Sequence, residues 1–330
     1  MTEATNEPVS TAGQVHPWVA GGQPMVRFGI VGGPAESWSA LRDFVQMVED
    51  LGFDSYWRPD HPMLLPDCWA TLAALAEATQ RIRLGSLVTC VSYRNPVVLA
   101  RLVADVDRIS GGRIVLGLGA GDIEAEYRAM GLEFPSLHAR QAALAEALEI
   151  LIPLLRGEVV TYRGEHMRVE GVALRPSPMQ HPYVPVLVGG GGPQTTLRLA
   201  AQYADASSIG AGAWGGSAAT DAIVRQKYAA LDVQCSAAGR PPAAVLRSFH
   251  CVPVLLADNP SALATKRERL PPELQAAADS SGLIGTPEQA LARIRPLVAA
   301  GCQYITLAVL DPDTLRLLAE RVVPEVNDAQ

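Results

Sequence analysis

Charged side chains are scarce in this sequence, and no block of basic residues stands out. Only 18% of the 330 residues are charged, and 34 acidic residues against 27 Lys and Arg give a net charge of −7 at pH 7. No Lys/Arg cluster supplies the positive surface that nucleic acid or an anionic membrane attracts. We therefore expect no nucleic acid and no membrane among the partners of this protein.

Cysteine and histidine are too scattered for a metal site or a disulfide framework. The five cysteines are odd in number and show no CxxC spacing, and the six histidines form no HExxH pattern. This use of cysteine fits a reducing compartment. We expect a cytoplasmic protein that binds no metal.

Long apolar runs are also lacking. The sequence has no stretch of about 18 apolar residues, the length that a membrane-spanning helix needs. Residues 1–24 mix polar residues with Pro and Gly, without the basic start and apolar run of a signal peptide. We expect 1–24 to be a flexible segment and 25–330 to form a single domain.

The sequence does have a regular alternation of short apolar runs with amphipathic stretches. In residues 37–51 apolar side chains recur at helical spacing, and Gly52 follows as a C-cap. The apolar runs predict eight strands: Met25–Val31, Phe53–Trp57, Ile82–Val88, Arg113–Leu118, Val186–Val188, Ala206–Ile209, Val245–Leu256 and Tyr304–Leu310. Strands that alternate with helices pair in parallel. Eight such units favour a (β/α)8 TIM barrel over a doubly wound sheet.

One segment departs from this alternation of strands and helices. Residues 156–183 contain the strand-prone run Val159–Tyr162 and leave through a proline-rich stretch. We predict a small β insertion within the barrel.

In a barrel of this kind, the chemistry lies where strands end and the following loops begin. Asp60 and His61 follow the second predicted strand. A carboxylate beside an imidazole suits proton transfer, because histidine gains or loses a proton near neutral pH. The alternative is a loop histidine bonded to the backbone.

Four consecutive glycines, Gly189–Gly192, follow the fifth predicted strand and precede a helix that starts near Pro193. Glycine lets the backbone approach a ligand closely, and a helix N-terminus offers N–H groups to a phosphate. The alternative is a tight turn with Pro193 in the first helical position. No GK[ST] follows, so the segment is not a P-loop.

The run Gly117–Asp122 follows the fourth predicted strand. It fails the GxGxxG fingerprint because Asp122 occupies the third glycine position. Small residues here would let a flat ring lie close to the strand, and Asp122 could cap a helix that begins at Ile123. Cys90 and Cys251 also fall near strand ends, where we expect buried, unreactive side chains.

Taken together, these stretches resemble the luciferase-like monooxygenase superfamily, and its F420-dependent branch most closely. The resemblance rests on Gly52–Trp57 with Asp60-His61, Arg83–Thr89, Tyr93–Pro96, Ser110–Gly121, Glu126-Tyr127, Val186–Gly190, Ala201–Asp205 and Gly285–Pro287. The resemblance implies a (β/α)8 barrel that holds a flavin or deazaflavin at its C-terminal mouth.

Several site residues are implied by this resemblance. A non-proline cis peptide between Leu87 and Val88 would support one face of the coenzyme ring. The coenzyme site would also include Asp60, Thr89, Gly119 and Ala120, and the coenzyme phosphate would lie on Gly190, Gly191 and Gly192 near Thr195. The insertion at 156–183 would cover the substrate.

Two residues would act in catalysis if the resemblance holds. His61 would transfer a proton, and Asp122 matches an acidic residue that protonates ring N1 in a sugar-phosphate dehydrogenase of the family. Such a carboxyl group needs burial to raise its pKa. Luciferases carry a phosphate-binding arginine where this chain has Ala120, which argues against their binding mode without excluding FMN.

The leading hypothesis is hydride transfer between coenzyme F420 and a small organic substrate. The alternatives are an FMNH2-dependent monooxygenase served by a flavin reductase, and a flavin-binding barrel without catalysis. The resemblance also implies a homodimer, with a separate flavin or F420 reductase as a possible partner. The substrate-binding loops vary freely on this scaffold, so the sequence does not identify the substrate.

Overall fold

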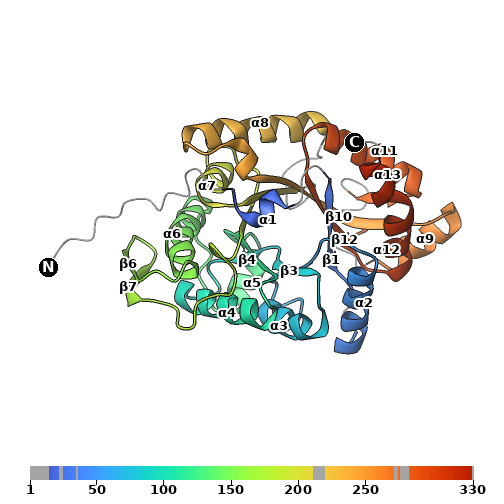
Figure 1. The fold of residues 1–330 in the computed structure, drawn as a ribbon. Helices are drawn as coiled ribbons and strands as arrows, with labels where there is room; N and C mark the ends of the chain where they lie inside the picture. The colour runs from blue at the N-terminus through green and yellow to red at the C-terminus, as the bar shows by residue number, and fades with distance from the viewer. Residues whose placement is uncertain are drawn as a thin grey trace.

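The computed structural model describes residues 15–21, 25–34, 36–210, 220–270, 274–275 and 282–328. Eight parallel strands close into a barrel, with β12 pairing β1 on one side and β10 on the other (Figure 1). The barrel strands are β1 (Arg27–Gly32), β2 (Ser55–Arg58), β3 (Arg83–Ser86), β5 (Ile114–Gly119), β8 (Val186–Gly189), β9 (Ala206–Gly210), β10 (Leu246–Leu256) and β12 (Tyr304–Val309). Two short strands, β4 (Thr89–Cys90) and β11 (Leu283–Gly285), extend the sheet at β5 and β10. The predicted (β/α)8 barrel is confirmed.

Helices surround the barrel and bury their apolar faces against the strands (Figure 1). They are α2 (Trp38–Asp50), α3 (Cys68–Ala78), α4 (Pro96–Ile109), α5 (Glu124–Ala129), α6 (Leu137–Leu155), α7 (Thr196–Tyr203), α8 (Asp221–Ala237), α9 (Pro260–Glu268), α11 (Pro287–Ala299), α12 (Pro312–Leu317) and α13 (Val323–Asn327), with shorter turns at Pro242–Ala244 and Leu318–Val322. In α2 the predicted apolar face is buried, and the Ser37 side chain caps the helix by accepting a bond of 3.1 Å from the Ala40 amide. Within the described residues, no helix is both long and apolar enough to cross a membrane.

Side chains fill the interior of the barrel. Trp57 on β2 is completely buried and its indole ring lies 6.0 Å from the ring of Tyr304 on β12. A Cβ atom on Gly85 would overlap this indole, so a glycine is needed on the neighbouring strand β3. The middle of the barrel is therefore a packed core, and ligands must bind at its ends.

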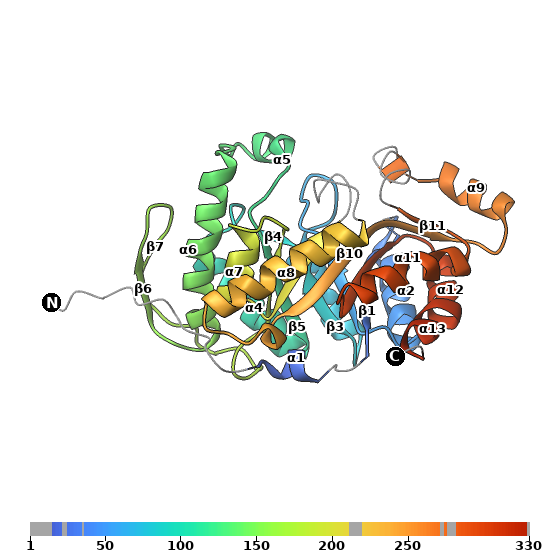
Figure 2. The same ribbon diagram turned by 90° about the horizontal axis from the view of Figure 1, so that it is seen from above.

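A short helix, α1 (Pro17–Ala20), packs across the N-terminal ends of the strands, at the bottom of Figure 2. Trp18 and Val19 are buried, and the Trp18 ring contacts that of Tyr304 at 6.0 Å. The expected flexible segment over 1–24 therefore includes a packed part, 15–21, because Trp18 finds a place in the core. Residues 1–14 and 22–24 lie outside the described residues.

The insertion forms an antiparallel hairpin of β6 (Val160–Arg163) and β7 (Arg168–Val172), as the sequence predicted. Glu146 on α6 holds the hairpin by accepting bonds from the Glu165 and Met167 amides at 2.8 and 2.7 Å. Figures 1 and 2 show the hairpin along the outer side of α6. The expectation that it covers the substrate is thus wrong, because α6 separates it from the barrel mouth.

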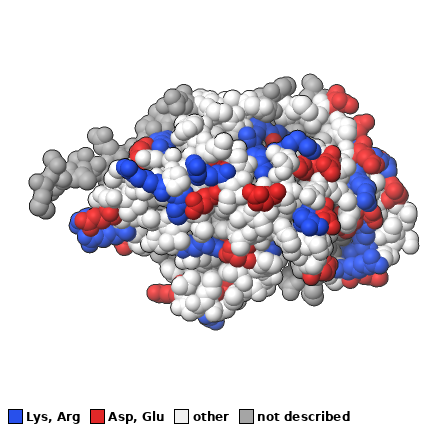
Figure 3. Space-filling model, turned by 60° about the horizontal axis from the view of Figure 1, so that its bottom comes forward, with Lys and Arg blue, Asp and Glu red and all other residues white. Residues whose placement is uncertain are grey.

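The face shown in Figure 3 carries basic and acidic side chains side by side, without a large patch of one sign. Several ion pairs on the surface link partly or fully exposed side chains, such as Arg101 with Asp105 along α4 and Arg128 with Glu124 along α5. Exposed pairs of this kind contribute little to stability.

Candidate active site

The loop after β2 is fixed by an ion-pair network. Asp60 is buried and both of its oxygens accept bonds from Arg94, at 2.5 and 3.0 Å. Arg94 also donates to Asp67 at 2.8 Å, and Asp67 caps α3 by accepting from the Ala70 amide. Burial raises the pKa of Asp60, and the Arg94 guanidinium opposes this rise. The structure thus places Asp60 where it holds the loop that carries His61.

His61 lies beside a buried carboxylate that the sequence analysis did not single out. Its Nδ1 atom is 3.1 Å from Oε2 of Glu126 on α5, and the Tyr93 hydroxyl donates to the same oxygen at 2.9 Å. Glu126 is only 3% exposed, and its Oε1 atom has no partner among the described residues. Burial and the Glu126 carboxylate raise the pKa of Tyr93, so its hydroxyl remains a donor. A histidine paired with a buried carboxylate suits proton transfer.

Asp122 is exposed and stands apart from this pair. Helix α5 begins at Glu124, and the residue in its N-cap position is Ile123, which makes no capping bond. The prediction that Asp122 caps the helix is therefore wrong. Its expected role as an acid required burial, which it lacks here. The sequence analysis named Glu126 only as part of the Glu126-Tyr127 motif of the family resemblance and gave it no role at the site.

The peptide bond between Leu87 and Val88 is cis, as the resemblance implied. The Val88 side chain lies over the glycines of the neighbouring strands, since a Cβ atom on Gly119 would be 2.5 Å from Val88 Cγ2 and one on Gly189 would be 3.1 Å from Cγ1. The space above Gly119 therefore holds Val88 rather than leaving the strand open to a flat ring. We call Leu87 and Val88 the shelf. Thr89 follows the shelf in the chain; it is buried and accepts a bond of 3.2 Å from the Trp69 indole.

The glycine run after β8 turns the chain into α7. Gly190 has φ +121°, a backbone conformation that other residues rarely adopt. Two of its amides are already used, because Gly190 donates to the Ser208 carbonyl and Gly192 to Thr196 Oγ1, both at 2.9 Å. A Cβ atom on Gly192 would lie 2.6 Å from Thr195 Oγ1. The helix begins at Thr196, later than the predicted start at Pro193.

A lysine from the next helix reaches the turn formed by Gly190, Gly191 and Gly192, which we call the glycine cradle. A Cβ atom on Gly191 would overlap Nζ of Lys227, which comes from α8. Neither the Lys227 ammonium nor the Gly191 amide has a hydrogen bond or ion pair with the residues that the structure describes. A cation beside a free N–H group fits a bound anion such as a phosphate. No local pattern in the sequence links these two residues, because Lys227 reaches Gly191 only when α8 packs against α7, the helix that follows the glycine run.

His250 on β10 shares the inner face of the barrel with Leu246, since side chains alternate along a strand. Its Nδ1 atom is 2.9 Å from Thr306 Oγ1, and burial lowers its pKa to about 4. His250 is thus a neutral group near the mouth at physiological pH. Cys90 and Cys251 are buried as expected, and burial raises the pKa of both thiols, which disfavours a reactive thiolate.

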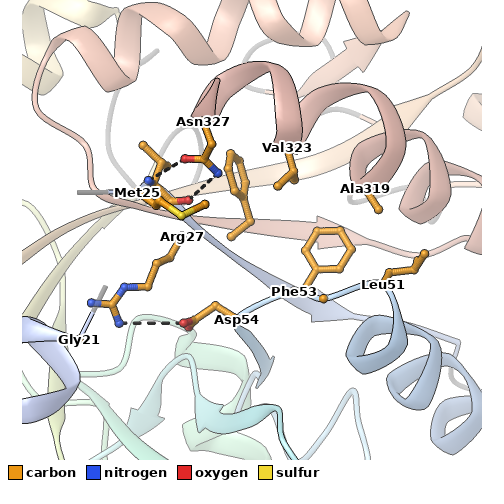
Figure 4. A pocket seen from close by; sticks show the side chains of 12 residues that line it. Gly21, Met25, Arg27, Leu51, Phe53, Asp54, Ala319, Val323 and Asn327 are labelled. Atoms are coloured by element: carbon orange, nitrogen blue, oxygen red, sulfur yellow. Dashed lines mark hydrogen bonds and ion pairs between the residues drawn. The ribbon is translucent and has the colours of Figure 1, made fainter. Parts of the chain in front are cut away.

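A separate cavity of about 380 Å³ lies at the other end of the barrel (Figure 4). It is lined by residues at the start of β1 and β2 and by the C-terminal helices. Asn327 accepts a bond of 2.9 Å from the Val26 amide there, and Arg27 lies 3.9 Å from Asp54. Conserved chemistry on barrels of this kind lies at the C-terminal ends of strands. We therefore assign no coenzyme to this cavity.

Comparisons with known proteins agree with the fold. A family model described as luciferase-like monooxygenase matches residues 11–271. The chain is 34% identical over 186 residues to 5,10-methylenetetrahydromethanopterin reductase of Archaeoglobus fulgidus, covering 56% of this chain and 53% of that protein. It is 35% identical over 173 residues to F420-dependent glucose-6-phosphate dehydrogenase of Microbacterium testaceum, covering 50% of each. The chain thus spans about half the length of the curated relatives it matches.

A solved structure gives the same picture of the fold. An F420-dependent secondary alcohol dehydrogenase, in complex with an F420–acetone adduct, superposes with a TM-score of 0.78 at 22% identity, over 92% of this chain and 99% of that chain. At this identity the likeness concerns the fold. The family model, in contrast, covers well over half of the sequence. The chain therefore belongs to the luciferase-like monooxygenase family.

Proposed function

We propose that this protein transfers a hydride between coenzyme F420 and a small organic substrate at the C-terminal mouth of the barrel. One observation carries the proposal: a proton-transfer pair, an apolar shelf and an anion cradle follow neighbouring strands of the same barrel end. They are the His61–Glu126 pair, the Leu87–Val88 shelf, and Gly190–Gly192 with Thr195 and Lys227. The similarity to a methylenetetrahydromethanopterin reductase and to F420-dependent glucose-6-phosphate dehydrogenases supports this choice of chemistry.

The residues present fit a planar coenzyme with a phosphate. Val88 offers an apolar face for the ring, and the free Gly191 amide and Lys227 ammonium offer two contacts to the phosphate. When bound, the deazaflavin would supply the hydride acceptor or donor. Ala120 in place of an arginine favours this cradle over the phosphate site of luciferases.

His61 would exchange a proton with the substrate. Its imidazole is 28% exposed, so a ligand at the mouth can reach it, and Glu126 holds its Nδ1 side. General acid–base catalysis by a positioned histidine contributes on the order of 10²–10⁴-fold to rate. Replacing His61 with Gln should therefore lower turnover about 100-fold or more and leave coenzyme binding within about twofold.

A second candidate function is favoured by the description of the family model, which names a monooxygenase. In that case the protein would use FMNH2 supplied by a flavin reductase and would consume oxygen. Reduced deazaflavin reacts poorly with oxygen, because carbon replaces nitrogen at ring position 5. Oxygen uptake thus separates the two functions.

The test is a pair of fluorescence titrations with F420 and FMN, followed by oxygen uptake with each reduced coenzyme. We expect saturable binding of F420, weaker binding of FMN, and no oxygen uptake above that of the free coenzyme. Tight binding of reduced FMN with rapid oxygen uptake, and no binding of F420, would reject the proposal in favour of the monooxygenase. Binding without turnover on any carbonyl, alcohol or imine substrate would favour a non-catalytic barrel.

A further inference from the structure

We propose that Glu126 is a positioning residue that keeps the proton of neutral His61 on Nδ1, so that Nε2 is the atom that exchanges a proton with the substrate. The inference rests on the proposed function of His61 and adds a role for a residue on a different element. Helix α5, which carries Glu126, lies at the end of the molecule that holds the C-terminal ends of the strands, next to the start of α6 (Figure 2).

The direction of the hydrogen bond follows from the chemistry of the two groups. An ionised carboxylate only accepts hydrogen bonds. Because His61 Nδ1 lies 3.1 Å from Glu126 Oε2, the proton of this bond must be on Nδ1. The Nε2 atom has no partner among the described residues and is left with its lone pair. Free histidine prefers the opposite tautomer, so the contact with Glu126 changes the state of the ring.

The neighbouring groups do not compete for His61. Both oxygens of Asp60 accept hydrogen bonds from Arg94, which also pairs with Asp67. The Tyr93 hydroxyl points at Glu126, and the Tyr127 hydroxyl lies 3.2 Å from Cys90 Sγ. Within the described residues, Glu126 is therefore the carboxylate that sets the tautomer of His61.

Packing holds Glu126 in place. The next residue, Tyr127, is fully buried, and its ring lies 5.3 Å from that of Tyr93 and 5.0 Å from that of Phe134. A second contact comes from the Tyr127 hydroxyl, which donates to the Ala120 carbonyl at 3.3 Å. A carboxylate fixed in this way can orient an imidazole without reorganising during the reaction.

The unpartnered oxygen of Glu126 argues for a functional role. Burial of a charged group with one oxygen unpaired costs free energy that a purely structural contact would avoid. When Nε2 takes a proton from a substrate O–H or N–H group, His61 becomes a cation. Its Nδ1–H bond to the Glu126 carboxylate then joins two opposite charges and is stronger. The carboxylate thus favours the state in which His61 holds the substrate proton.

The test reads the tautomer directly and needs no substrate. In a long-range ¹H–¹⁵N spectrum of the protein labelled at histidine, the signals of His61 are those lost in the His61→Gln variant. We expect the Nδ1–H tautomer in the wild type and in Glu126→Gln, which keeps an acceptor oxygen. In Glu126→Leu we expect loss of the Nδ1–H tautomer, with Nε2–H in its place.

Two variants serve as controls. Tyr93→Phe removes the other donor to Oε2, and Glu124→Gln removes an exposed carboxylate from the same helix; both should keep the wild-type tautomer. The His250 signals, from a ring held by Thr306, report whether each variant is folded. An Nε2–H tautomer in the wild type, or an unchanged tautomer in folded Glu126→Leu, would overturn the inference.

This outcome can be told apart from failure of the proposed function. The spectrum is recorded without coenzyme, whereas the function is tested by F420 titration. We expect Glu126→Leu to bind F420 within about twofold of the wild type, because Glu126 contacts His61 and not the cradle. Wild-type protein that shows the Nδ1–H tautomer and fails to bind F420 would keep the inference about Glu126 and reject the coenzyme.

Discussion

Lys227 illustrates how a single side chain gives the glycine cradle its charge. Backbone amides alone offer little selectivity at this cradle, because Gly190 and Gly192 already donate to Ser208 and Thr196. The ammonium of Lys227 adds a cation against Gly191, with no ion pair among the described residues to satisfy it. An anionic ligand would be held mainly by this charge.

The Lys227→Met variant should bind F420 about tenfold more weakly, the loss expected when one charge-assisted contact is removed. The difference from the wild type should shrink at high salt, since ions screen a partly exposed charge. Arg225→Met is a matched control, because it removes a positive charge from the exposed face of the same helix. Equal weakening in both variants, measured by fluorescence titration, would place the anion elsewhere.

His250 makes stability depend on pH. Its folded-state pKa of about 4 is below the value of about 6.5 in an unfolded chain, so the unfolded state binds more protons between these values. Stability should therefore fall as the pH drops from 6.5 to 4, by about 2–3 kcal/mol from this residue. In His250→Asn this part of the dependence should disappear. Urea unfolding at pH 7 and pH 5 measures it, and identical pH dependence in both proteins would contradict the assignment.

At the scale of elements, the shelf depends on glycines in the strands beside it. Val88 fits into the barrel mouth because Gly117, Gly119 and Gly189 have no side chains to occupy that space. The Val88 side chain, two residues beyond the end of β3, therefore lies close to both β5 and β8. The shape of the candidate coenzyme site is thus set by the glycines of neighbouring strands and not by the cis peptide alone.

Gly119→Ala should displace Val88, since the new methyl group would lie 2.5 Å from its Cγ2 atom. We expect a loss of about 1–3 kcal/mol in stability, as for overpacking in a core, together with weaker F420 binding. Gly210→Ala is the control, because a Cβ atom there meets nothing within 4 Å. Wild-type coenzyme affinity in a folded Gly119→Ala protein would show that the shelf does not contact the ring.

Local patterns predicted most elements well. The helix expected over residues 37–51 is found at Trp38–Asp50, because helical spacing and a capping residue such as Ser37 are local features. Helix α1 was missed, since four residues give too short a pattern to read. The Asp122 cap was wrong because α5 begins one residue later than expected, at Glu124, which puts Ile123 in the N-cap position.

The site was only partly predictable for the same reason. His61 and the glycine run follow strand ends directly, so the sequence order points to them, whereas the cis peptide at Leu87–Val88 was implied by the family resemblance. Glu126 and Lys227 lie on helices, and the packing of α5 and α8 around the barrel decides which way their side chains face. No spacing along the chain brings them to the mouth.

At the scale of the whole molecule, the two ends of the barrel serve different purposes. The C-terminal end carries the candidate site, whereas α1 closes the N-terminal end by burying Trp18 against Tyr304. The packed interior, with Trp57 across its middle, separates these ends. Changes at the closed end should therefore affect stability and not ligand binding.

Trp18→Ala should lower stability by about 3–5 kcal/mol, the usual cost of removing a large buried aromatic side chain. Binding of F420 to the folded variant should be unchanged. Val15→Ala, a truncation at an exposed position of the same segment, should have little effect on either property. A Trp18→Ala protein with wild-type urea resistance would mean that residues 15–21 do not pack as described.

The most direct test of the account is a crystal structure of the protein with F420 bound. The account predicts the deazaflavin ring against Val88 with His61 beside it, and the coenzyme phosphate in contact with the Gly191 amide and Lys227. A ring bound in the cavity beside Asn327 at the other end of the barrel, or a phosphate distant from Lys227, would contradict it.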